Sequence, residues 1–257
     1  MKLYANGCSF TWGGDLIKSL HCKDTGKLLN GSCDVELNKW RLNVTWPKHL
    51  SDLFNCTEFH NESLGCGSNY RIVRKTLDFF LPKIHKNEDV SDWLAIIQWS
   101  GPARIEYFSE YNNCWTMVNH NLTIRERDIP NWPSTEYADE VDKLFLESYY
   151  KTFNNEFFST IWFQQINLLG MFFESNKINY LFTSMANPTL YFDNMHMDFI
   201  KKYRWFGSDN KHVYSINNMG IEMTSHPTLL GHKQIAEKFY DYIIKNKAYN
   251  KDSNESH

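Results

Sequence analysis

The sequence predicts an α/β fold in which a mostly parallel sheet carries helices on both faces. Residues 93–99 and 178–184 are continuously apolar runs, as expected of strands that are buried on both sides. Helical hydrophobic periodicity fills residues 136–174 between them and indicates one or two helices. Strands that alternate with helices in this way are typical of parallel sheets.

The other elements follow from local signals. Residues 2–6 predict a first strand that stops at a tight turn beginning with Gly7. Pro47 suits the first turn of a helix, and Ser68 or Asn69 suits a helix cap. The remaining expected elements are helices over 46–54, 69–84 and 228–245, a strand over 56–61, and a short strand near Val213–Ile216 within an irregular region over 186–225.

The chain of 257 residues is long enough to bury one core, and we expect a single α/β domain over residues 1–246. Residues from about 101 to 135 are polar, aromatic and proline-containing, which predicts an insertion or lid. The polar residues 247–257 predict a frayed C-terminal tail.

Composition argues against several functions. The net charge is −3 without a Lys/Arg block, so nothing favours nucleic acid. No run approaches the roughly 20 apolar residues of a membrane span, and the start MKLYANGCSF lacks a secretory signal, so we expect a cytoplasmic protein. The six cysteines form no CxxC pair, and the Asp193, His196 and Asp198 cluster lacks metal-site spacing. We therefore expect free thiols and neither a metal nor a cofactor.

Three loops follow the early strands: GCSFTWGG, LGCGSN and QWSGPAR. Because ligands bind at the carboxyl ends of strands in such sheets, these loops are expected to gather at one edge and form a site. Ser9 comes just past the first strand, where its hydroxyl is exposed as a nucleophile and its N–H can face an oxyanion. The alternative is that Ser9 simply caps a helix.

His226 is the candidate base. It precedes Pro227, which excludes it from a helix and places it in the loop before the last helix. From there a neutral imidazole could take the Ser9 proton and return it to a leaving group. The alternative is a surface histidine, and His232 is better explained as a residue in the first turn of the last helix.

The segments GCSFTWGG, NESLGCGSN, QWS and HPTLLGH resemble, in order and spacing, the four conserved blocks of SGNH (GDSL-like) hydrolases. WPxxL and GSNYRIVR are similar to a subset found in viral and bacterial genomes. The resemblance spans residues 3 to about 243. It implies a three-layer, flavodoxin-like α/β/α sandwich that hydrolyses acyl esters through an acyl-serine, without a cofactor.

Mapped onto this chain, the resemblance makes Ser9 the nucleophile and His226 the base. Gly65 matches the glycine donor to the oxyanion, with Gly67 as a competing alignment, and Asn69 lies among the binding residues of the same segment. The family's asparagine donor is replaced, so Ser100 or Gln98 would have to serve.

Two further positions depart from the family. Cys8 stands where the family has Asp, which leaves a cysteine nucleophile as a remote alternative. The orienting Asp is missing, and Glu222, four residues before His226, is the nearest carboxylate. Glu222 could orient the imidazole or be a solvated charge, and a Ser-His dyad held by a backbone carbonyl is the remaining option.

The sequence therefore predicts an esterase that cleaves an O-acyl ester, with O-acetyl favoured, on a carbohydrate or small molecule. The alternatives are a catalytically inactive binding or structural protein of the same fold, and an acyltransferase using the same Ser-His pair. Arg104 and Glu106, after the third loop, are expected to pair with each other; the alternative is that Arg104 reaches an anionic substrate. Nothing in the sequence indicates an oligomeric state.

Overall fold

The structure is a computed structural model. It describes residues 1–14, 16, 35–109, 114–119, 122–125, 140–152, 154–185, 187–200, 202–206 and 215–246. The expected tail over 247–257, residues 213–214 of the expected short strand and much of the expected insertion lie outside these ranges.

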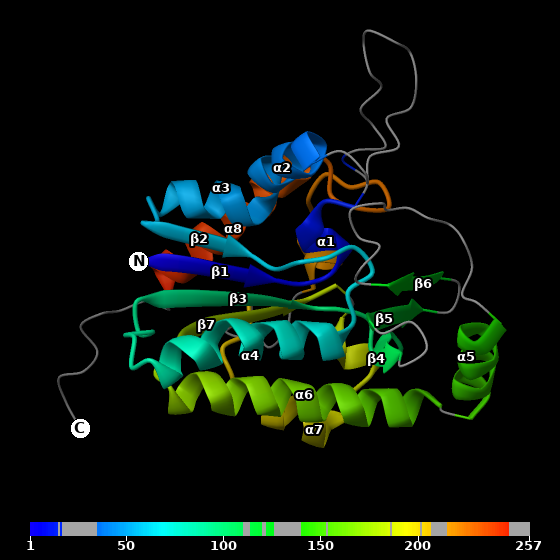
Figure 1. The fold of residues 1–257 in the computed structure, drawn as a ribbon. Helices are drawn as coiled ribbons and strands as arrows, with labels where there is room; N and C mark the ends of the chain where they lie inside the picture. Colours follow the sequence, from blue (N-terminus) through cyan, green and yellow to red (C-terminus); the bar gives the residue numbers. More distant parts are fainter. Residues whose placement is uncertain are drawn as a thin grey trace, which may run out of the picture.

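Four parallel strands form the central sheet, in the order β2-β1-β3-β7 (Figure 1). Their bounds are β1 (Lys2–Asn6), β2 (Glu58–Asn61), β3 (Trp93–Trp99) and β7 (Asn179–Ser184). Each was expected from the sequence to within two residues. Beyond β7, isolated parallel bridges join Phe182 to Trp205 and Ser184 to Ser215.

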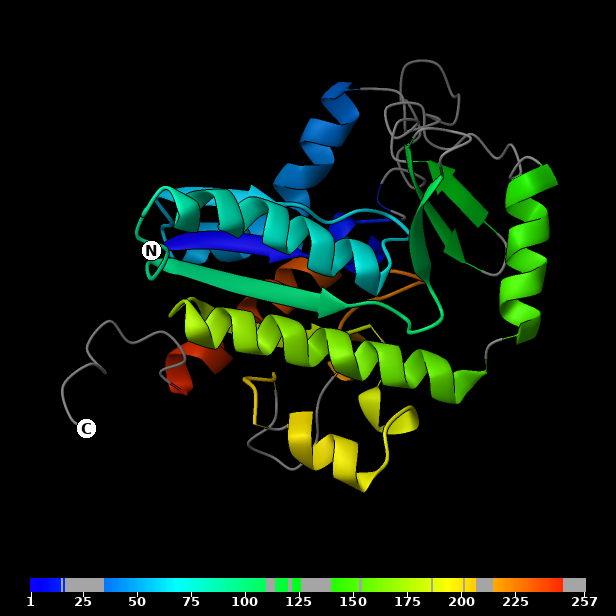
Figure 2. The ribbon, with the colours of Figure 1, turned by 60° about the horizontal axis from the view of Figure 1, so that its bottom comes forward.

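Helices cover both faces of this sheet and make three layers (Figures 1 and 2). One face carries α4 (Asn69–His85), α6 (Asn155–Ser175) and α7 (Asn194–Ile200), and the other carries α2 (Val35–Val44), α3 (Trp46–Leu53) and α8 (Leu229–Lys245). The predicted α/β class with a mostly parallel sheet is confirmed. The sequence interpretation missed α2 and α7.

The seven residues of β3 show why the apolar runs are continuous. Trp93, Ala95 and Ile97 pack with α4 and α6, whereas Leu94 and Ile96 pack with α3 and α8. All of them are buried. A strand covered on both faces has no side that prefers polar residues.

A second, antiparallel sheet lies beyond the carboxyl end of β3, in the order β4-β5-β6, with α5 (Glu140–Thr152) beside it (Figure 2). Its strands are β4 (Ile105–Ser109), β5 (Cys114–Asn119) and β6 (Leu122–Arg125). Met117 on β5 forms a small buried cluster with Leu64, and Trp12 packs against this cluster, so the sheet contacts the loops that follow β1 and β2. Within the described residues, no helix is both long and apolar enough to cross a membrane.

His232 joins α8 to α3. It lies in the first turn of α8, as the sequence predicts, and its Nδ1 accepts the Trp46 backbone N–H at the start of α3 at 3.1 Å. The ring is fully buried, and burial lowers its pKa to about 3. The histidine is thus a neutral structural acceptor.

We expect stability to fall with acid because of His232. Its folded pKa is lower than its unfolded one, so between pH 6.5 and about 3 the unfolded chain binds the extra proton. This contribution is complete above pH 6.5 and is lost as pH falls, at up to about 1.4 kcal/mol per pH unit. The measurement is urea unfolding of wild type and His232→Asn, whose Oδ1 replaces the acceptor. If the difference between their unfolding free energies does not change with pH in this range, the interpretation is wrong.

Candidate active site

One buried side chain, the amide of Gln98 near the end of β3, holds the loop after β1. Its Oε1 accepts hydrogen bonds from the Cys8 N–H at 3.2 Å, from Cys8 Sγ at 3.3 Å and from Thr11 Oγ1 at 3.1 Å. Gly7 leaves the space for this contact, because a Cβ there would lie 2.9 Å from Gln98 Oε1. Gln98 therefore fixes the backbone on which Ser9 is mounted.

Ser9 opens α1 (Ser9–Trp12), a single helical turn that ends at Gly13 with φ of +83°. The N–H groups of Gly13 and Gly14 both donate to the Ser9 carbonyl at 2.9 Å. Cys8, in extended conformation, is the N-cap residue of this turn, and its side chain makes no cap hydrogen bond. The alternative that Ser9 is itself the cap is thus wrong, and its hydroxyl is available for another contact.

His226 lies at the tip of a tight loop before α8. The loop is closed by backbone hydrogen bonds from the Thr224 N–H to the His226 carbonyl at 3.0 Å and from the Thr228 N–H to the Glu222 carbonyl at 3.2 Å. Thr228 also caps α8. Gly231 allows the Glu222 carbonyl to pack against the start of α8, since a Cβ at this position would collide with that carbonyl oxygen. The loop therefore has a defined position relative to the sheet edge.

The two loops bring Ser9 and His226 together across 217 positions of sequence: the distance from His226 Nε2 to Ser9 Oγ is 2.8 Å. In the tautomer that carries its proton on Nδ1, Nε2 accepts the Ser9 hydroxyl hydrogen. The Phe10 ring packs against the imidazole with centroids 5.0 Å apart, and Gly14 is so close that a Cβ would lie 3.1 Å from both Ser9 Cβ and His226 Nε2. Ser9 is 6% exposed.

The structure does not bring Glu222 to the imidazole. The Glu222 carboxylate accepts the Thr228 hydroxyl at 2.8 Å, and among the described residues its contact is with Thr228 and not with His226. Ser225 Oγ lies 3.4 Å from His226 Nδ1. Glu222 thus acts on the loop and not on the ring.

The second loop lies directly against the first. The Leu64 N–H donates to the Gly7 carbonyl at 3.1 Å. Gly67 faces the same backbone, because a Cβ on it would lie 3.2 Å from that carbonyl oxygen and 3.7 Å from Cys8 Cα. The residues around Gly65 are therefore neighbours of the Ser9 turn.

Backbone donors at this edge distinguish the two glycine alignments. Gly67 donates its N–H to the Leu64 carbonyl at 3.0 Å, across a turn in which Cys66 has a φ of +59°. By contrast, the N–H groups of Ser9 and Gly65 have no acceptor among the described residues. A non-glycine residue in the left-handed region is a local strain of the kind found at functional sites. Gly65 is thus the better-placed donor of the two.

Asn69 and Ser100 tie the third loop to the start of α4. The Ser100 N–H donates to Asn69 Oδ1 at 2.7 Å, and Asn69 Nδ2 donates to the Ser100 carbonyl at 3.3 Å. Both residues are buried. Gln98 Nε2 donates to the Trp99 carbonyl at 2.6 Å. The residues expected to supply a side-chain donor therefore connect the loops to one another.

The expected pair of Arg104 and Glu106 does not form. Arg104 Nη1 donates to Ser100 Oγ at 3.0 Å, whereas both Glu106 carboxylate oxygens accept from Arg74, at 2.9 and 2.7 Å. Arg74 lies on α4, and Glu106 lies on β4. The two residues are 32 positions apart, so the sequence alone could not indicate this pair.

In the cluster of Asp193, His196 and Asp198, the first two residues interact at the start of α7. Asp193 Oδ1 accepts the His196 backbone N–H at 2.8 Å and lies 2.8 Å from His196 Nδ1, at the start of α7. Over the part of the chain that the structure describes, no three His, Cys, Asp or Glu side chains could hold a metal ion together.

An aromatic-cation stack borders the site and was missed by sequence reasoning. The Arg41 guanidinium lies 3.2 Å from the Trp12 ring centroid, and a Cβ on Gly65 would lie 3.1 Å from the same ring. Burial lowers the pKa of Arg41 to about 9. The contact between Arg41 and Trp12 could not be predicted from the sequence, because the two residues are far apart in the chain and the helix that carries Arg41 was itself not predicted.

The chain is distantly similar to several solved structures. A search of curated proteins gave no match. Distantly similar structures include a protein from Desulfitobacterium hafniense DCB-2 assigned to the G-D-S-L lipolytic family (14% identity, 94% of this chain and 98% of that one, TM-score 0.42). The psychrotrophic esterase EstA from Pseudoalteromonas sp. is 10% identical over 96% of this chain and 98% of its own, with a TM-score of 0.42. TesA is 9% identical, over 95% of this chain and 98% of its own, with a TM-score of 0.37.

A family model matches residues 27–254, which include Gly65 and His226 and begin after Ser9. With most of its length matched, the chain belongs to the family described as "Family of unknown function (DUF6071)".

Proposed function

We propose that this protein is a serine hydrolase that cleaves an O-acyl ester through an acyl-serine, with Ser9 as nucleophile and His226 as general base and acid. The distance of 2.8 Å between Ser9 Oγ and His226 Nε2 carries the proposal. It lies within the hydrogen-bond reach that proton transfer requires. The pair comes from the loops after β1 and before α8, where ligands bind in this kind of sheet.

In the first half-reaction, Ser9 Oγ attacks the ester carbonyl carbon while its proton passes to His226 Nε2. The tetrahedral intermediate then collapses, the bond to the alcohol oxygen breaks, and the departing alkoxide takes the proton from Nε2. In the second half-reaction, water attacks the acyl-serine and gives its proton to Nε2. Collapse of this second intermediate releases the acid and returns the proton to Ser9 Oγ.

The N–H groups of Ser9 and Gly65 are the proposed donors to the oxyanion. Both lack an acceptor among the described residues, and the contact between Gly65 and Trp12 places the second loop against α1. Each donor in such a hole is worth about 10²–10³ in rate. The side-chain amides of Gln98 and Asn69 support the loops instead of donating to the substrate, whereas Ser100 Oγ accepts from Arg104.

The Glu222 contact leads to a specific expectation. Glu222→Gln is expected to keep kcat for p-nitrophenyl acetate within about threefold of wild type, because its carboxylate bonds Thr228 and not the imidazole. Loss of an orienting carboxylate would instead cost about 10⁴-fold. The unfolding free energy should drop by about 1 kcal/mol or less, through the weakened Thr228 bond. Glu237→Gln, at an exposed position on α8, is the control. A thousandfold loss of kcat in Glu222→Gln, but not in Glu237→Gln, would show that Glu222 completes a catalytic triad.

The proposed substrate is a small acyl ester, with acetyl favoured, on a carbohydrate or small molecule. Ser9 is 6% exposed and is closely flanked by Phe10 and Gly14, which leaves little room for a long acyl chain. We further propose one domain over residues 1–246, with the segment from about 101 to 135 as an insertion whose Met117 helps to wall the site beside Trp12.

The test is p-nitrophenyl acetate turnover together with labelling by a fluorophosphonate. Wild type is expected to hydrolyse the acetate and to take up one label per chain. The release of free acetate is also measured with a sugar acceptor added. If it decreases and acylated sugar appears, the same Ser-His pair catalyses acyl transfer. A folded wild type that neither labels nor turns over would show a catalytically inactive binding protein.

A further inference from the structure

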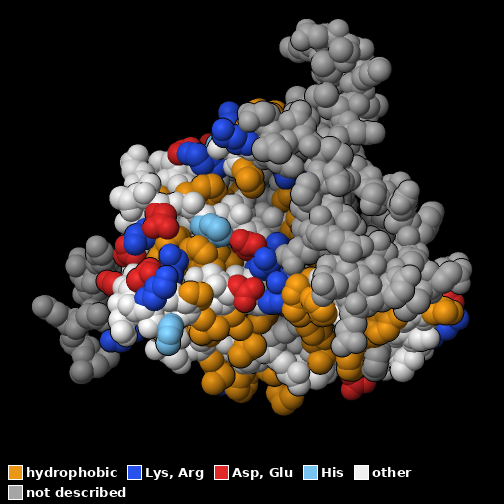
Figure 3. Space-filling model, in the orientation of Figure 1, with side chains coloured by type: hydrophobic (Ala, Val, Ile, Leu, Met, Phe, Trp, Pro, Cys, Tyr) orange, Lys and Arg blue, Asp and Glu red, His pale blue; other side chains and the backbone are white. Residues whose placement is uncertain are grey.

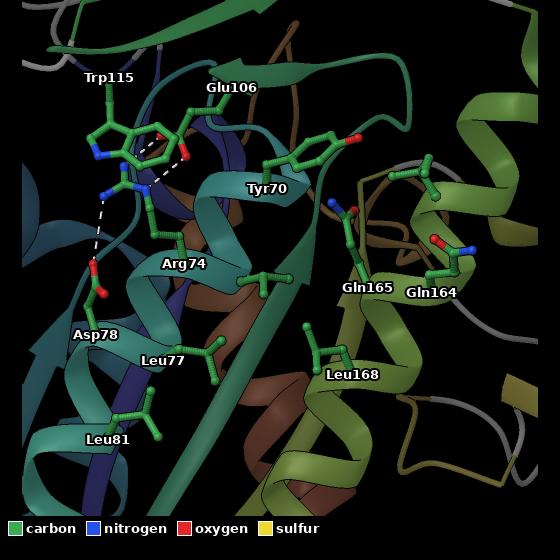
Figure 4. A pocket seen from close by; sticks show the side chains of 12 residues that line it. Tyr70, Arg74, Leu77, Asp78, Leu81, Glu106, Trp115, Gln164, Gln165 and Leu168 are labelled. Carbon is green, nitrogen blue, oxygen red and sulfur yellow. Dashed lines mark hydrogen bonds and ion pairs between the residues drawn. The ribbon is translucent and has the colours of Figure 1, made fainter. Parts of the chain in front are cut away.

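A pocket of about 630 Å³ lies away from the Ser9 loops, between α4, α6 and the β4-β5 edge (Figure 4). Neither Ser9 nor His226 lines it. Its volume falls in the range of small-molecule sites. The aliphatic part of its wall is formed by Val73, Leu77, Leu81, Ile161 and Leu168.

The pocket continues onto an apolar surface. Hydrophobic side chains gather over α4 and α6 on this face (Figure 3). Leu81 is 50% exposed and Leu168 is 51% exposed, although both line the pocket. Exposed leucines beside a cavity are expected to gain free energy when a ligand covers them.

The charged end of the pocket is already neutralised. Arg74 holds Glu106 through two hydrogen bonds and lies 3.7 Å from Asp78, and the Trp115 ring stacks over its guanidinium at 4.2 Å (Figure 4). These three ionised side chains carry one negative charge in excess. An anionic ligand would therefore meet a cation whose charge is already compensated.

Gln165 supplies a neutral polar group in the wall of the pocket. It is 8% exposed and lines the pocket, yet among the described residues no group hydrogen-bonds its side-chain amide. Figure 4 shows this amide on the Tyr70 side of α6. The amide is neutral, can both donate and accept, and is not one of the fully buried, unpartnered polar groups of the described residues, so it is open to a ligand head group in the pocket.

We propose that this pocket binds a neutral, single-chain amphiphile. Its aliphatic tail lies along Leu77 and Leu168, and a hydroxyl or amide head both donates to and accepts from the Gln165 amide. A carboxylate head is disfavoured, because Arg74 is committed to Glu106 and Asp78. The site is separate from Ser9, so it does not depend on the proposed ester chemistry.

The experiment is calorimetric titration of the full chain with 1-decanol and with decanoate, below their aggregation limits. Decanol is expected to saturate one site per chain, and decanoate to bind at least about tenfold more weakly, from the loss of roughly 1.4 kcal/mol. Leu168→Glu should weaken decanol by at least about tenfold, since it adds a charge to the wall. Met171→Glu, on the same helix and outside the pocket lining, should stay within about twofold.

Gln165→Leu separates a ligand anchor from a structural amide. It should weaken decanol about fivefold by removing one hydrogen bond, while the melting temperature stays level or rises. The proposal is overturned if decanol shows no saturable binding, if decanoate binds as tightly, or if the two glutamate variants behave alike. Self-association abolished by Leu168→Glu, with no decanol binding, would make this face a contact between copies of the chain.

Discussion

Ser9→Ala and His226→Ala are each expected to lower kcat for p-nitrophenyl acetate by about 10⁴-fold or more. The reason is their mutual contact at 2.8 Å: without the hydroxyl there is no nucleophile, and without the imidazole nothing takes its proton. Residues that act as one unit are non-additive, so the double variant should be no slower than the slower single variant. Steady-state and single-turnover kinetics measure this.

Matched controls come from residues of the same type at exposed positions. Ser91→Ala, before β3, and His85→Ala, at the end of α4, should keep wild-type kcat. Circular dichroism and unfolding midpoints establish that the variants fold. Retention of more than about a tenth of the activity in folded Ser9→Ala, or additive losses in the double variant, would place the chemistry elsewhere.

Gln98→Leu is expected to give the second largest effect, on stability and turnover together. The substitution leaves the Cys8 N–H and the Thr11 hydroxyl buried without their acceptor. Each unsatisfied group costs about 1–3 kcal/mol, so the unfolding free energy should fall by roughly 2–6 kcal/mol. The Ser9 turn loses its brace at the same time, and kcat should fall about 10–100-fold, since a misplaced nucleophile reacts slowly.

Gln164→Leu on α6 is the control, because that side chain is exposed. Urea unfolding and p-nitrophenyl acetate kinetics are measured on both variants. A Gln98→Leu protein with wild-type stability would show that the three hydrogen bonds to its amide are not important. Normal kcat in a destabilised protein would show that Gln98 holds the fold without positioning Ser9.

The fold could be predicted where local sequence carries the signal. β3 is a continuous apolar run because both of its faces are covered, and α8 is amphipathic because one face packs on the sheet. The loops of Ser9 and His226 were predicted from a glycine turn and a His-Pro step, which are also local signals. Helix α7 was missed within a region interpreted as irregular, so its short helical pattern was not recognised.

Side-chain partners could not be predicted from spacing. Glu222 is four residues from His226, but the turn of the loop directs its carboxylate to Thr228. Glu106 is two residues from Arg104, but it pairs with Arg74 on a helix that comes earlier in the chain. In both cases the partner is set by tertiary packing. The same holds for Gln98, whose inward direction depends on the alternation of β3.

The proposal that Ser9 is the nucleophile is tested most directly by locating the fluorophosphonate adduct. Trypsin releases a peptide spanning residues 3–18, and fragment masses distinguish Ser9 from the neighbouring Cys8. The expected result is a single adduct on Ser9 in wild type and almost none in His226→Ala. An adduct on Cys8 or on any other residue, or a folded wild type that remains unlabelled, would contradict it.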